Sequence, residues 1–312
     1  HRLSSAASDV YKRQLYNQTG QSVYQGLWED GTRSGNGTAW LEDGSIYSGN
    51  WVDDYPDGKG TYLFPDGTEY EGGFIRGKKH GQGTFKEADG FVSYDGEWKD
   101  GQRFGKGRVN KRDSSSYDGD WLDGKPHGNG MFTYPDGRVY TGTMKQGLRQ
   151  GLGELRRSDG SIAYEGEWDR NLRHGKGKAY SASGLIKFDG DFFDGYQSGT
   201  GSEYRDDGTL YYQGSWEQNL KDGQGKIYSN AGDIIFEGNF KAGQPDGQGQ
   251  EFRENGSPVY SGGFVKGLRE GSGKLYGMNG VLIYEGQFKA NRRHGSGTVS
   301  YTHLTLPTIT GV

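Results

Sequence analysis

The chain has no cysteine among its 312 residues, so disulfide bonds and cysteine-ligated zinc are excluded. It is also poor in aliphatic residues, because leucine, isoleucine, valine and phenylalanine together fill only 52 positions. No apolar run approaches the roughly 20 residues that a membrane-spanning helix needs, and the N-terminus has no apolar stretch of the signal-peptide type. We therefore expect a cytoplasmic protein. Its net charge of −4 argues against nucleic acid as a partner.

Glycine and aromatic residues are abundant instead, and they recur at a fixed spacing. The pattern aromatic-x-Gly-x-aromatic, a short spacer, Gly, three residues and Gly-x-Gly is written twelve times, first between Tyr24 and Gly37. The aromatic residues that open each copy, here called the anchors, are Tyr24, Tyr47, Tyr70, Tyr94, Tyr117, Tyr140, Tyr164, Phe188, Tyr212, Phe236, Tyr260 and Tyr284. Such a period indicates a repeat array. The regular placement of the rings predicts an ordered chain despite the low aliphatic content.

Each repeat reads as a β-hairpin. From Tyr94 to Trp98, aromatic residues and glycine alternate with acids, which is the period of a half-buried strand. A turn signal ending at Gly101 follows, and a second extended stretch starts at Gly105. Nothing in the repeat has helical periodicity. The predicted fold is therefore all-β: an elongated, twisted, single-layer antiparallel sheet of tandem hairpins, solenoid-like, with stacked rings as its core.

The glycines have two expected purposes. A glycine between two large rings is expected to leave a slot for an aromatic ring of the adjoining unit. The Gly-x-Gly pair is expected to permit positive φ and close backbone approach at a bend or bulge.

The pattern also predicts domain boundaries. Repeats over 15–160 have mostly a 23-residue period, and repeats over 161–298 have a 24-residue period, which indicates two sub-arrays. The flanks, 1–14 and 299–312, do not fit the repeat and resemble translated sequencing-adaptor sequence. We interpret them as non-native flanks, the alternative being native disordered ends.

No catalytic, cofactor or metal residue stands out from the repeat background. Outside the flanks, His80, His127, His174 and His294 each precede the first glycine of Gly-x-Gly, and the closest are two repeats apart, or roughly 19 Å at the usual strand spacing. Recurring acids are expected to be solvated and paired across strands. A phosphate-loop interpretation of Gly-x-Gly fails because no helix follows it. These features predict a protein that is not an enzyme and has no small-molecule substrate.

Basic residues gather in the predicted loops. The densest cluster consists of Arg103, Lys106, Arg108, Lys111 and Arg112. Such a patch would attract anionic phospholipids at about 1 kcal/mol per charge near a membrane surface. Acidic residues are interleaved, so a solvated loop edge is the simpler interpretation.

The repeat resembles the MORN repeat (membrane occupation and recognition nexus), as in Tyr94-Asp-Gly-Glu-Trp-Lys-Asp-Gly-Gln-Arg-Phe-Gly-Lys-Gly, and the resemblance covers residues 15–298. It implies an elongated β-sheet with a groove along one face. MORN arrays occur in membrane-junction proteins, ciliary and cytoskeletal scaffolds, plant phosphoinositide kinases and some methyltransferases. The departures from the pattern are modest: Met144 replaces the second ring, Phe188 and Phe236 replace tyrosine, and Asn171, Asn219 and Asn291 replace the first turn glycine.

The resemblance leads to a first functional hypothesis and to alternatives. The first is a non-catalytic scaffold that binds a protein helix or extended peptide along an aromatic and glycine groove. A membrane or a cytoskeletal or ciliary structure is its candidate location. The expected contact residues are Trp98, Trp121, Trp168, Tyr94, Tyr117 and Tyr164. One alternative is a peripheral membrane module that binds anionic phospholipids through the basic cluster. Another is a regulatory array of a larger enzyme, such as a phosphoinositide kinase. Bare sheet edges also predict edge-to-edge self-association.

Overall fold

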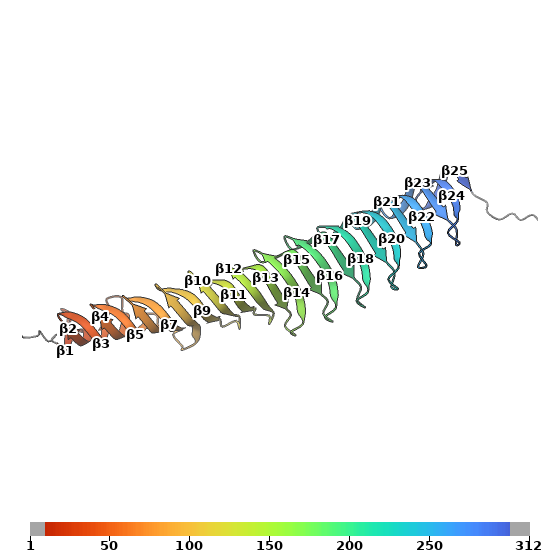
Figure 1. Ribbon diagram of the computed structural model, residues 1–312. Helices are drawn as coiled ribbons and strands as arrows, with labels where there is room; N and C mark the ends of the chain where they lie inside the picture. The colour runs from red at the N-terminus through yellow and green to blue at the C-terminus, as the bar shows by residue number, and fades with distance from the viewer. Residues whose placement is uncertain (1–9, 300–312) are drawn as a thin grey trace, which may run out of the picture. The chain divides into compact units, whose positions relative to one another are not determined.

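A computed structural model describes residues 10–299, and within that range every regular element is a β-strand (Figure 1). The described residues divide into two compact units: unit 1 holds residues 10–153 and 157–160, and unit 2 holds residues 154–156 and 161–299. The division lies beside the position where the period changes from mostly 23 to 24 residues.

The strands of unit 1 are β1 (Tyr11–Tyr16), β2 (Ser22–Glu29), β3 (Thr32–Trp40), β4 (Ile46–Val52), β5 (Tyr55–Leu63), β6 (Glu69–Ile75), β7 (Lys78–Lys86), β8 (Val92–Lys99), β9 (Gln102–Asn110), β10 (Ser116–Leu122), β11 (Lys125–Thr133), β12 (Val139–Lys145) and the first part of β13 (Leu148–Arg156). The strands of unit 2 are the end of β13, β14 (Ile162–Asp169), β15 (Leu172–Tyr180), β16 (Ile186–Phe193), β17 (Tyr196–Tyr204), β18 (Leu210–Glu217), β19 (Leu220–Tyr228), β20 (Ile234–Lys241), β21 (Gln244–Phe252), β22 (Pro258–Val265), β23 (Leu268–Tyr276), β24 (Leu282–Lys289) and β25 (Arg292–Val299).

Within each unit the strands pair in sequence order. From β1 to β12, and again from β14 to β25, every strand is antiparallel to the next one along the chain. Each unit is therefore a run of hairpins whose sheet does not close on itself. The prediction of an all-β fold built from tandem hairpins is confirmed.

The two strands of each repeat are joined by a two-residue turn with positive φ at both positions, as in Asp100 (φ 50°) and Gly101 (φ 86°). This is the type I′ geometry that matches strand twist and favours Asn, Asp and Gly. The three asparagines that replace glycine here adopt the same conformation, with φ between 67° and 73°. Asp54 (φ 68°) also replaces the turn glycine, in addition to the three asparagines recognised from the sequence.

These tight turns also link one hairpin to the preceding one. The Gly101 N–H donates to Lys79 O (2.9 Å), and the Asn219 N–H donates to Gln197 O (3.0 Å). Where the turn residue is Asn or Asp, its side chain returns a second bond, since Asn219 Oδ1 accepts from the Gln197 N–H at 2.8 Å. Neighbouring hairpins are thus held at their turns as well as along their strands.

The Gly-x-Gly pair lies at a bulge, as predicted. In β8 and β9, Gly96 pairs with Gly107 and Trp98 pairs with Arg103, so three residues of β9 lie opposite one residue of β8. The first glycine of the pair, Gly105, has φ 60°. An L-residue with a side chain is strained in this conformation, which explains the glycine.

The change of period has a structural cause. In a 23-residue repeat, β5 and β6 pair without a shift of register. In a 24-residue repeat, one residue just before the anchor is unpaired: Ser93 lies between the pairs Lys86–Val92 and Phe85–Tyr94. The extra residue is therefore a β-bulge, and the same shift recurs in β16, β18, β20, β22 and β24 of unit 2.

The first strand begins earlier than the predicted boundary. β1 starts at Tyr11, inside the flank that the sequence analysis set aside, and pairs with β2. A sheet edge pairs through main-chain groups, so an extended segment can occupy it whatever its side chains. At the other end, Val299 belongs to β25. The remaining parts of both flanks, 1–9 and 300–312, lie outside the described residues.

Candidate functional site

The two sides of each sheet are chemically different. One side, here called the ring face, carries the anchors and the second aromatic residue of each repeat. The other side, here called the glycine face because the main chain of the glycines is open to it, carries the polar residues that alternate with the rings. Tyr47, Gly49 and Trp51 belong to the ring face, and Ser48 belongs to the glycine face.

On the ring face, most anchors lie between two edge-on rings. The Tyr47 ring is 5.1 Å from the Trp51 ring of its own strand and 5.1 Å from the Phe74 ring of the next hairpin, at interplanar angles of 86° and 82°. Such edge-to-face pairs are each worth about 0.5–1.5 kcal/mol beyond area burial. The rings form a continuous buried row within each unit, and this row is the core.

The glycine slots are filled differently from the expectation. A Cβ placed on Gly60 would lie 2.4 Å from the Tyr47 hydroxyl, and one on Gly49 would lie 2.6 Å from it. The ring over each glycine pair therefore belongs to the anchor of the same hairpin, and the adjoining unit supplies only the second ring. The phenylalanine anchors Phe188 and Phe236 lie over their own glycines in the same way, so packing sets the position of the ring. In Tyr47 the hydroxyl adds a hydrogen bond, which it donates to Asn50 O at 2.8 Å.

A cation covers many of these rings. The residue of each second strand that pairs with the second ring, here called the cap position, is Arg33, Lys79, Arg103, Arg173, Lys221, Arg269 or Arg293 in seven repeats. The Arg103 guanidinium lies 4.8 Å from the Tyr94 ring centre and 5.2 Å from that of Trp121. Cation–π contacts of this kind contribute about 0.5–2 kcal/mol, depending on burial. The cap position had no signal in the sequence analysis.

Lys79 is the most enclosed of the caps. Its ammonium nitrogen lies 4.8 Å from the ring centres of Phe85 and Trp98 and 5.1 Å from those of Phe64 and Tyr70. Burial, together with the positive charge of Arg103, lowers the pKa of the Lys79 ammonium to about 8. Burial also lowers the pKa of the Arg103 guanidinium.

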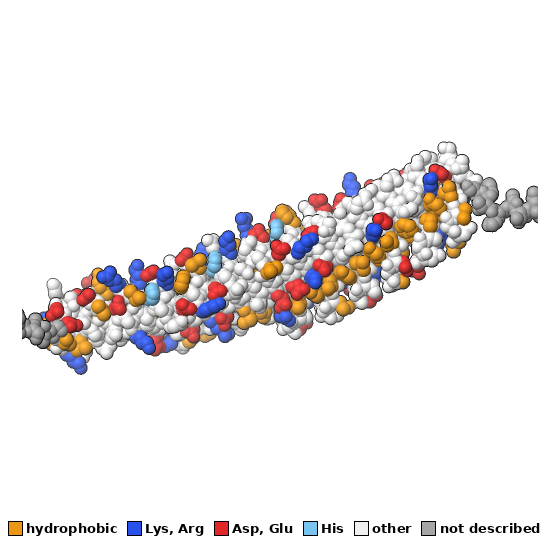
Figure 2. All heavy atoms as spheres, viewed as in Figure 1, with side chains coloured by type: hydrophobic (Ala, Val, Ile, Leu, Met, Phe, Trp, Pro, Cys, Tyr) orange, Lys and Arg blue, Asp and Glu red, His pale blue; other side chains and the backbone are white. Residues whose placement is uncertain are grey.

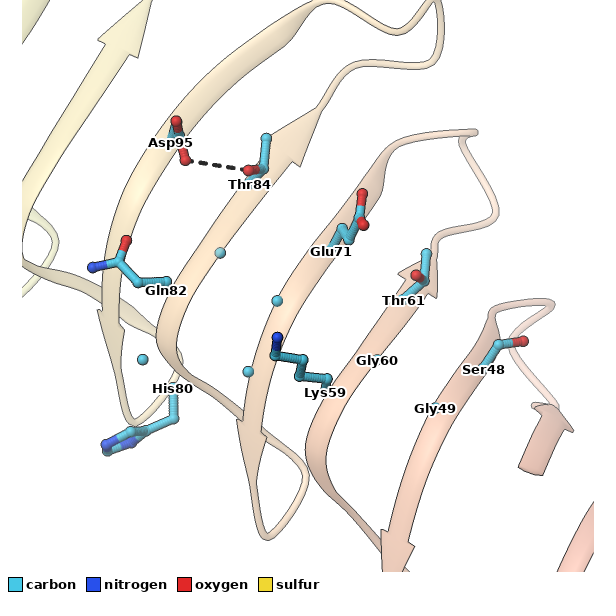
Figure 3. A pocket seen from close by; sticks show the side chains of 14 residues that line it. Ser48, Gly49, Lys59, Gly60, Thr61, Glu71, His80, Gln82, Thr84 and Asp95 are labelled. Atoms are coloured by element: carbon cyan, nitrogen blue, oxygen red, sulfur yellow. Dashed lines mark hydrogen bonds between the residues drawn. The ribbon is translucent and has the colours of Figure 1, made fainter. Parts of the chain in front are cut away.

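The glycine face of unit 1 is hollowed into a groove (Figure 3). One hollow on this face has a volume of about 690 Å³, and its floor is the row Gly49, Gly60, Gly72 and Gly83. A second hollow of about 670 Å³ contains Gly26, Gly37 and Gly49. The two hollows share Gly49, and successive floor glycines pair directly across the strands, so they form one groove. In Figure 2 an uncoloured band runs over unit 1 between charged side chains.

The walls of this groove are polar. One wall is formed by Ser48, Thr61, Glu71, Thr84 and Asp95, and the other includes Lys59 and Gln82 (Figure 3). The groove therefore differs from the expected aromatic and glycine groove: the glycines are present, but the rings lie behind them on the other face. The anchors fill the ring side of the floor, which leaves only main chain and polar side chains on the groove side.

The six residues predicted to contact a partner all lie in the buried row. Tyr94, Tyr117 and Tyr164 are at most 2% exposed, and Trp98, Trp121 and Trp168 are 4–7% exposed. The Trp98 indole N–H donates to Gly83 O at 3.0 Å, and the Trp121 indole N–H donates to Gly107 O at 2.8 Å. Their burial explains them as core residues, and their direct contact with a partner stays a prediction.

The five basic residues of the predicted lipid patch are not brought together. Arg103 lies on the ring face as a cap, whereas Lys106 and Arg108 alternate on the glycine face and Lys111 and Arg112 lie in the loop after β9. Two are paired with acids, since Lys106 Nζ is 2.5 Å from Asp120 and Arg112 Nη2 is 2.7 Å from Asp89. Lipid binding through this set stays a prediction, and the placement of its members does not favour it.

The recurring acids of the glycine face have identifiable partners. Glu97 Oε1 accepts from the Lys106 N–H at 2.9 Å, and Asp120 Oδ2 accepts from the Asn129 N–H at 2.9 Å. Each of these carboxylates therefore satisfies a main-chain donor at the bulge of its own hairpin. The hydrogen bond from Lys106 and its positive charge lower the pKa of Asp120. Among residues 10–299 no three His, Asp or Glu side chains are grouped closely enough to hold a metal ion.

A smaller hollow lies on the ring face of unit 2. It has a volume of about 480 Å³ and is lined mainly by Ile227, Ile235, Pro245, Phe252 and Val259. Ile235 and Val259 are bulge residues of the 24-residue repeats, so the extra residue of the longer period adds apolar surface to the ring face. No helix in the described part of the chain is long and apolar enough to cross a bilayer.

The order of strands, the turns and the two-faced hairpins define an all-β tandem-repeat protein. The family model of the MORN repeat matches twelve segments of the chain: 24–46, 47–69, 70–91, 94–109, 117–137, 140–162, 164–186, 188–210, 212–234, 236–257, 260–281 and 284–302. The chain belongs to the MORN-repeat family, and the recognition made from the sequence is confirmed.

Two solved structures are similar in part. The TCP10 domain of Danio rerio CPAP, in complex with a peptide of Danio rerio STIL, is 12% identical with a TM-score of 0.36; the match covers 74% of this chain and all of that one. The TCP domain of SAS-4 (dCPAP), in complex with a proline-rich motif of Ana2 (dSTIL) of Drosophila melanogaster, is 14% identical with a TM-score of 0.31 over 56% of this chain and 87% of that one. At this level they say nothing about what this chain binds. A search of curated proteins finds no match.

Proposed function

We propose that this chain is a non-catalytic scaffold that binds an extended segment of a protein partner in the glycine-floored groove of unit 1. The observation that carries the proposal is the groove itself. Four paired glycines expose main chain along its floor, and polar side chains stand on both sides.

The dimensions of the groove favour an extended chain over a helix. The walls stand on the same strands. Lys59 of one wall and Thr61 of the other are two residues apart in β5, or roughly 7 Å at the usual strand rise. An α-helix with its side chains is about 10–12 Å across. An extended segment can therefore reach the floor, whereas a helix would rest on the walls.

The chemistry of the walls favours a binding role. Thr84 Oγ1 donates to Asp95 at 3.2 Å, and Glu71 lies 2.9 Å from the Lys86 ammonium. Hydroxyl, amide, carboxylate and ammonium groups alternate along the groove, which suits recognition of main-chain and polar groups of a peptide. Self-association through sheet edges, regulation of a larger enzyme, a cytoplasmic location and a place at a membrane or cytoskeleton stay predictions.

Site-specific photo-crosslinking tests the proposal. A photoreactive residue is placed at Thr61 or Gln82 in the groove, and at the exposed loop residue Glu42 as a matched control. In extract of cells that make the protein, we expect a protein adduct from both groove positions and none from the control. The substitution Thr84→Trp, which fills the groove, should abolish the Gln82 adduct. The same adducts from all three positions, or none from the groove, would contradict the proposal.

A further inference from the structure

The cap positions differ in whether an acid neutralises their charge. Arg33 of unit 1 pairs with Asp54 at 3.0 Å, whereas Arg173 of unit 2 donates to the Gly195 carbonyl. In unit 2, the Lys221 ammonium lies 2.8 Å from Glu203 Oε2, an ionic contact without hydrogen-bond alignment. Arg269 donates from Nε to Glu251 Oε2 at 2.8 Å and forms a second contact with it through Nη2. Both acids lie on the ring face, each in the second strand of the preceding hairpin, so at these two caps the chain supplies its own counter-charge.

In unit 1 the same two positions hold no acid. Glu203 pairs with the anchors of two successive hairpins, Phe188 and Tyr212. In unit 1, the residue in the corresponding place is Tyr62 for Lys79 and Phe85 for Arg103. Among the described residues, neither Lys79 nor Arg103 has a carboxylate within 4.0 Å. Asp100 and Asp123 line a hollow that Arg103 also borders, without forming an ion pair with it. Two half-buried cations on neighbouring hairpins therefore lack counter-charges.

A half-buried cation without a counter-ion is a costly arrangement. Removing charge from water is unfavourable unless an opposite charge or hydrogen bonds compensate for it, and ring contacts compensate only in part. The lowered pKa of Lys79 has the same cause. An anion that reached both cations would recover the missing stabilisation, as the glutamates do in unit 2.

We propose that the ring face of unit 1 binds an acidic segment of a protein through Lys79 and Arg103, with Phe64, Phe85 and Trp98 packing around its apolar atoms. Unit 2 shows that the group accepted at a cap position is a carboxylate. The two cations lie one hairpin apart, or roughly 10 Å from the usual strand spacing. Acidic residues three positions apart match this distance when the partner segment adopts the polyproline II conformation. That conformation has three residues per turn and rises about 3.1 Å per residue, so both side chains point to the same side.

This surface is separate from the groove of the proposed function. The caps lie on the ring face, and the groove lies on the glycine face of the same strands. Failure of the crosslinks from Thr61 and Gln82 would therefore leave this inference unaffected, and failure of the test below would leave the groove proposal unaffected.

Fluorescence anisotropy with the full chain tests the inference. The probe is a labelled twelve-residue peptide with two glutamates three positions apart among alanine and serine, and its matched control has glutamines instead. At low salt we expect the glutamate peptide to bind at least tenfold more tightly than the control. The double variant Lys79→Gln, Arg103→Gln should remove that preference, and Lys221→Gln with Arg269→Gln should leave it unchanged. Equal binding of both peptides, or an unchanged preference in the unit 1 variant, overturns the inference.

Two further measurements keep the test decisive. The variants Tyr62→Glu and Phe85→Glu place carboxylates where unit 2 has them, so the added peptide should lose at least tenfold in affinity. Acylation of the Lys79 amine near pH 8, followed by mass spectrometry, should be slowed by the glutamate peptide only, because a bound carboxylate favours the protonated amine. Vesicles of anionic phospholipid serve as the competing source of negative charge. The inference is overturned in favour of a membrane surface if three results occur together: the protein binds these vesicles, the unit 1 double variant does not, and the protein shows no preference for the glutamate peptide.

Discussion

Gly60 offers the sharpest test of how the rings and glycines fit together. It lies in β5 with ordinary extended backbone, so replacing it by alanine introduces no left-handed strain. The new Cβ would lie 2.4 Å from the hydroxyl of Tyr47 and 2.6 Å from two of its ring carbons. Such distances do not occur between real atoms, so the Tyr47 ring must move.

The ring has nowhere to move at low cost. Tyr47 is 1% exposed, and the edges of Trp51 and Phe74 meet it from both sides. Moving it breaks the hydrogen bond to Asn50 O, worth about 1 kcal/mol, and disturbs two ring contacts of about 0.5–1.5 kcal/mol each. Overpacking alone costs about 1–3 kcal/mol. We therefore expect Gly60→Ala to lower the local free energy of unfolding by about 3–7 kcal/mol.

Native-state hydrogen exchange is the suitable assay, because a repeat array opens locally rather than all at once. Amides of β4, β5 and β6 should exchange much faster in the variant, and those of β18 to β20 in unit 2 should serve as an internal reference. Gly90→Ala is the matched control: Gly90 has φ 85° and nothing within 4 Å of its Cβ position, so only the left-handed strain of about 1–2 kcal/mol applies. If the two variants destabilise equally, the ring-over-glycine explanation is wrong.

Three further predictions use the same contacts. Trp98→Phe removes the indole donor to Gly83 O while keeping a ring, so local stability by hydrogen exchange should fall by about 1 kcal/mol; a loss above about 3 kcal/mol would mean that the hydrogen bond is not the main difference. Deleting Ser93 converts a 24-residue repeat into the 23-residue form and should leave the far-ultraviolet circular dichroism spectrum intact. Deleting Thr84 is the contrasting change, because it moves every following residue of β7 to the opposite face of the sheet and should unfold that hairpin. Burial raises the pKa of Tyr94 to about 12 from an ordinary 10, so the folded state disfavours the phenolate. This contribution to stability is complete below pH 10 and should be lost as the pH rises from 10 towards 12. Ionisation of the anchors near pH 10, measured by absorbance at 295 nm with circular dichroism unchanged, would refute this.

The sequence by itself determined the repeat, the hairpins and the order of the strands. An alternating strand has one apolar face, a type I′ turn needs residues that tolerate positive φ, and consecutive hairpins pair with their neighbours, so a fixed period leaves little freedom. Asn171 could be recognised as a turn residue, and Gly105 as a bulge residue, from local chemistry alone. The burial of Trp98 also followed from alternation, although alternation cannot say whether a buried ring meets a partner.

Only the tertiary structure decided which groups meet across hairpins. The ring over Gly60 could come from its own hairpin or from the next one, and the position of Tyr47 over Gly49 and Gly60 shows that it comes from its own. Arg103 looked like a loop cation in the sequence, but pairing with Trp98 places it on the ring face. The contrast between Lys79 and Lys221 is likewise invisible in a single repeat, because the counter-charge of a cap comes from the preceding hairpin. Contacts that depend on register between neighbouring units are not encoded in the period, which is why the chemistry of both faces had to be read from the folded chain.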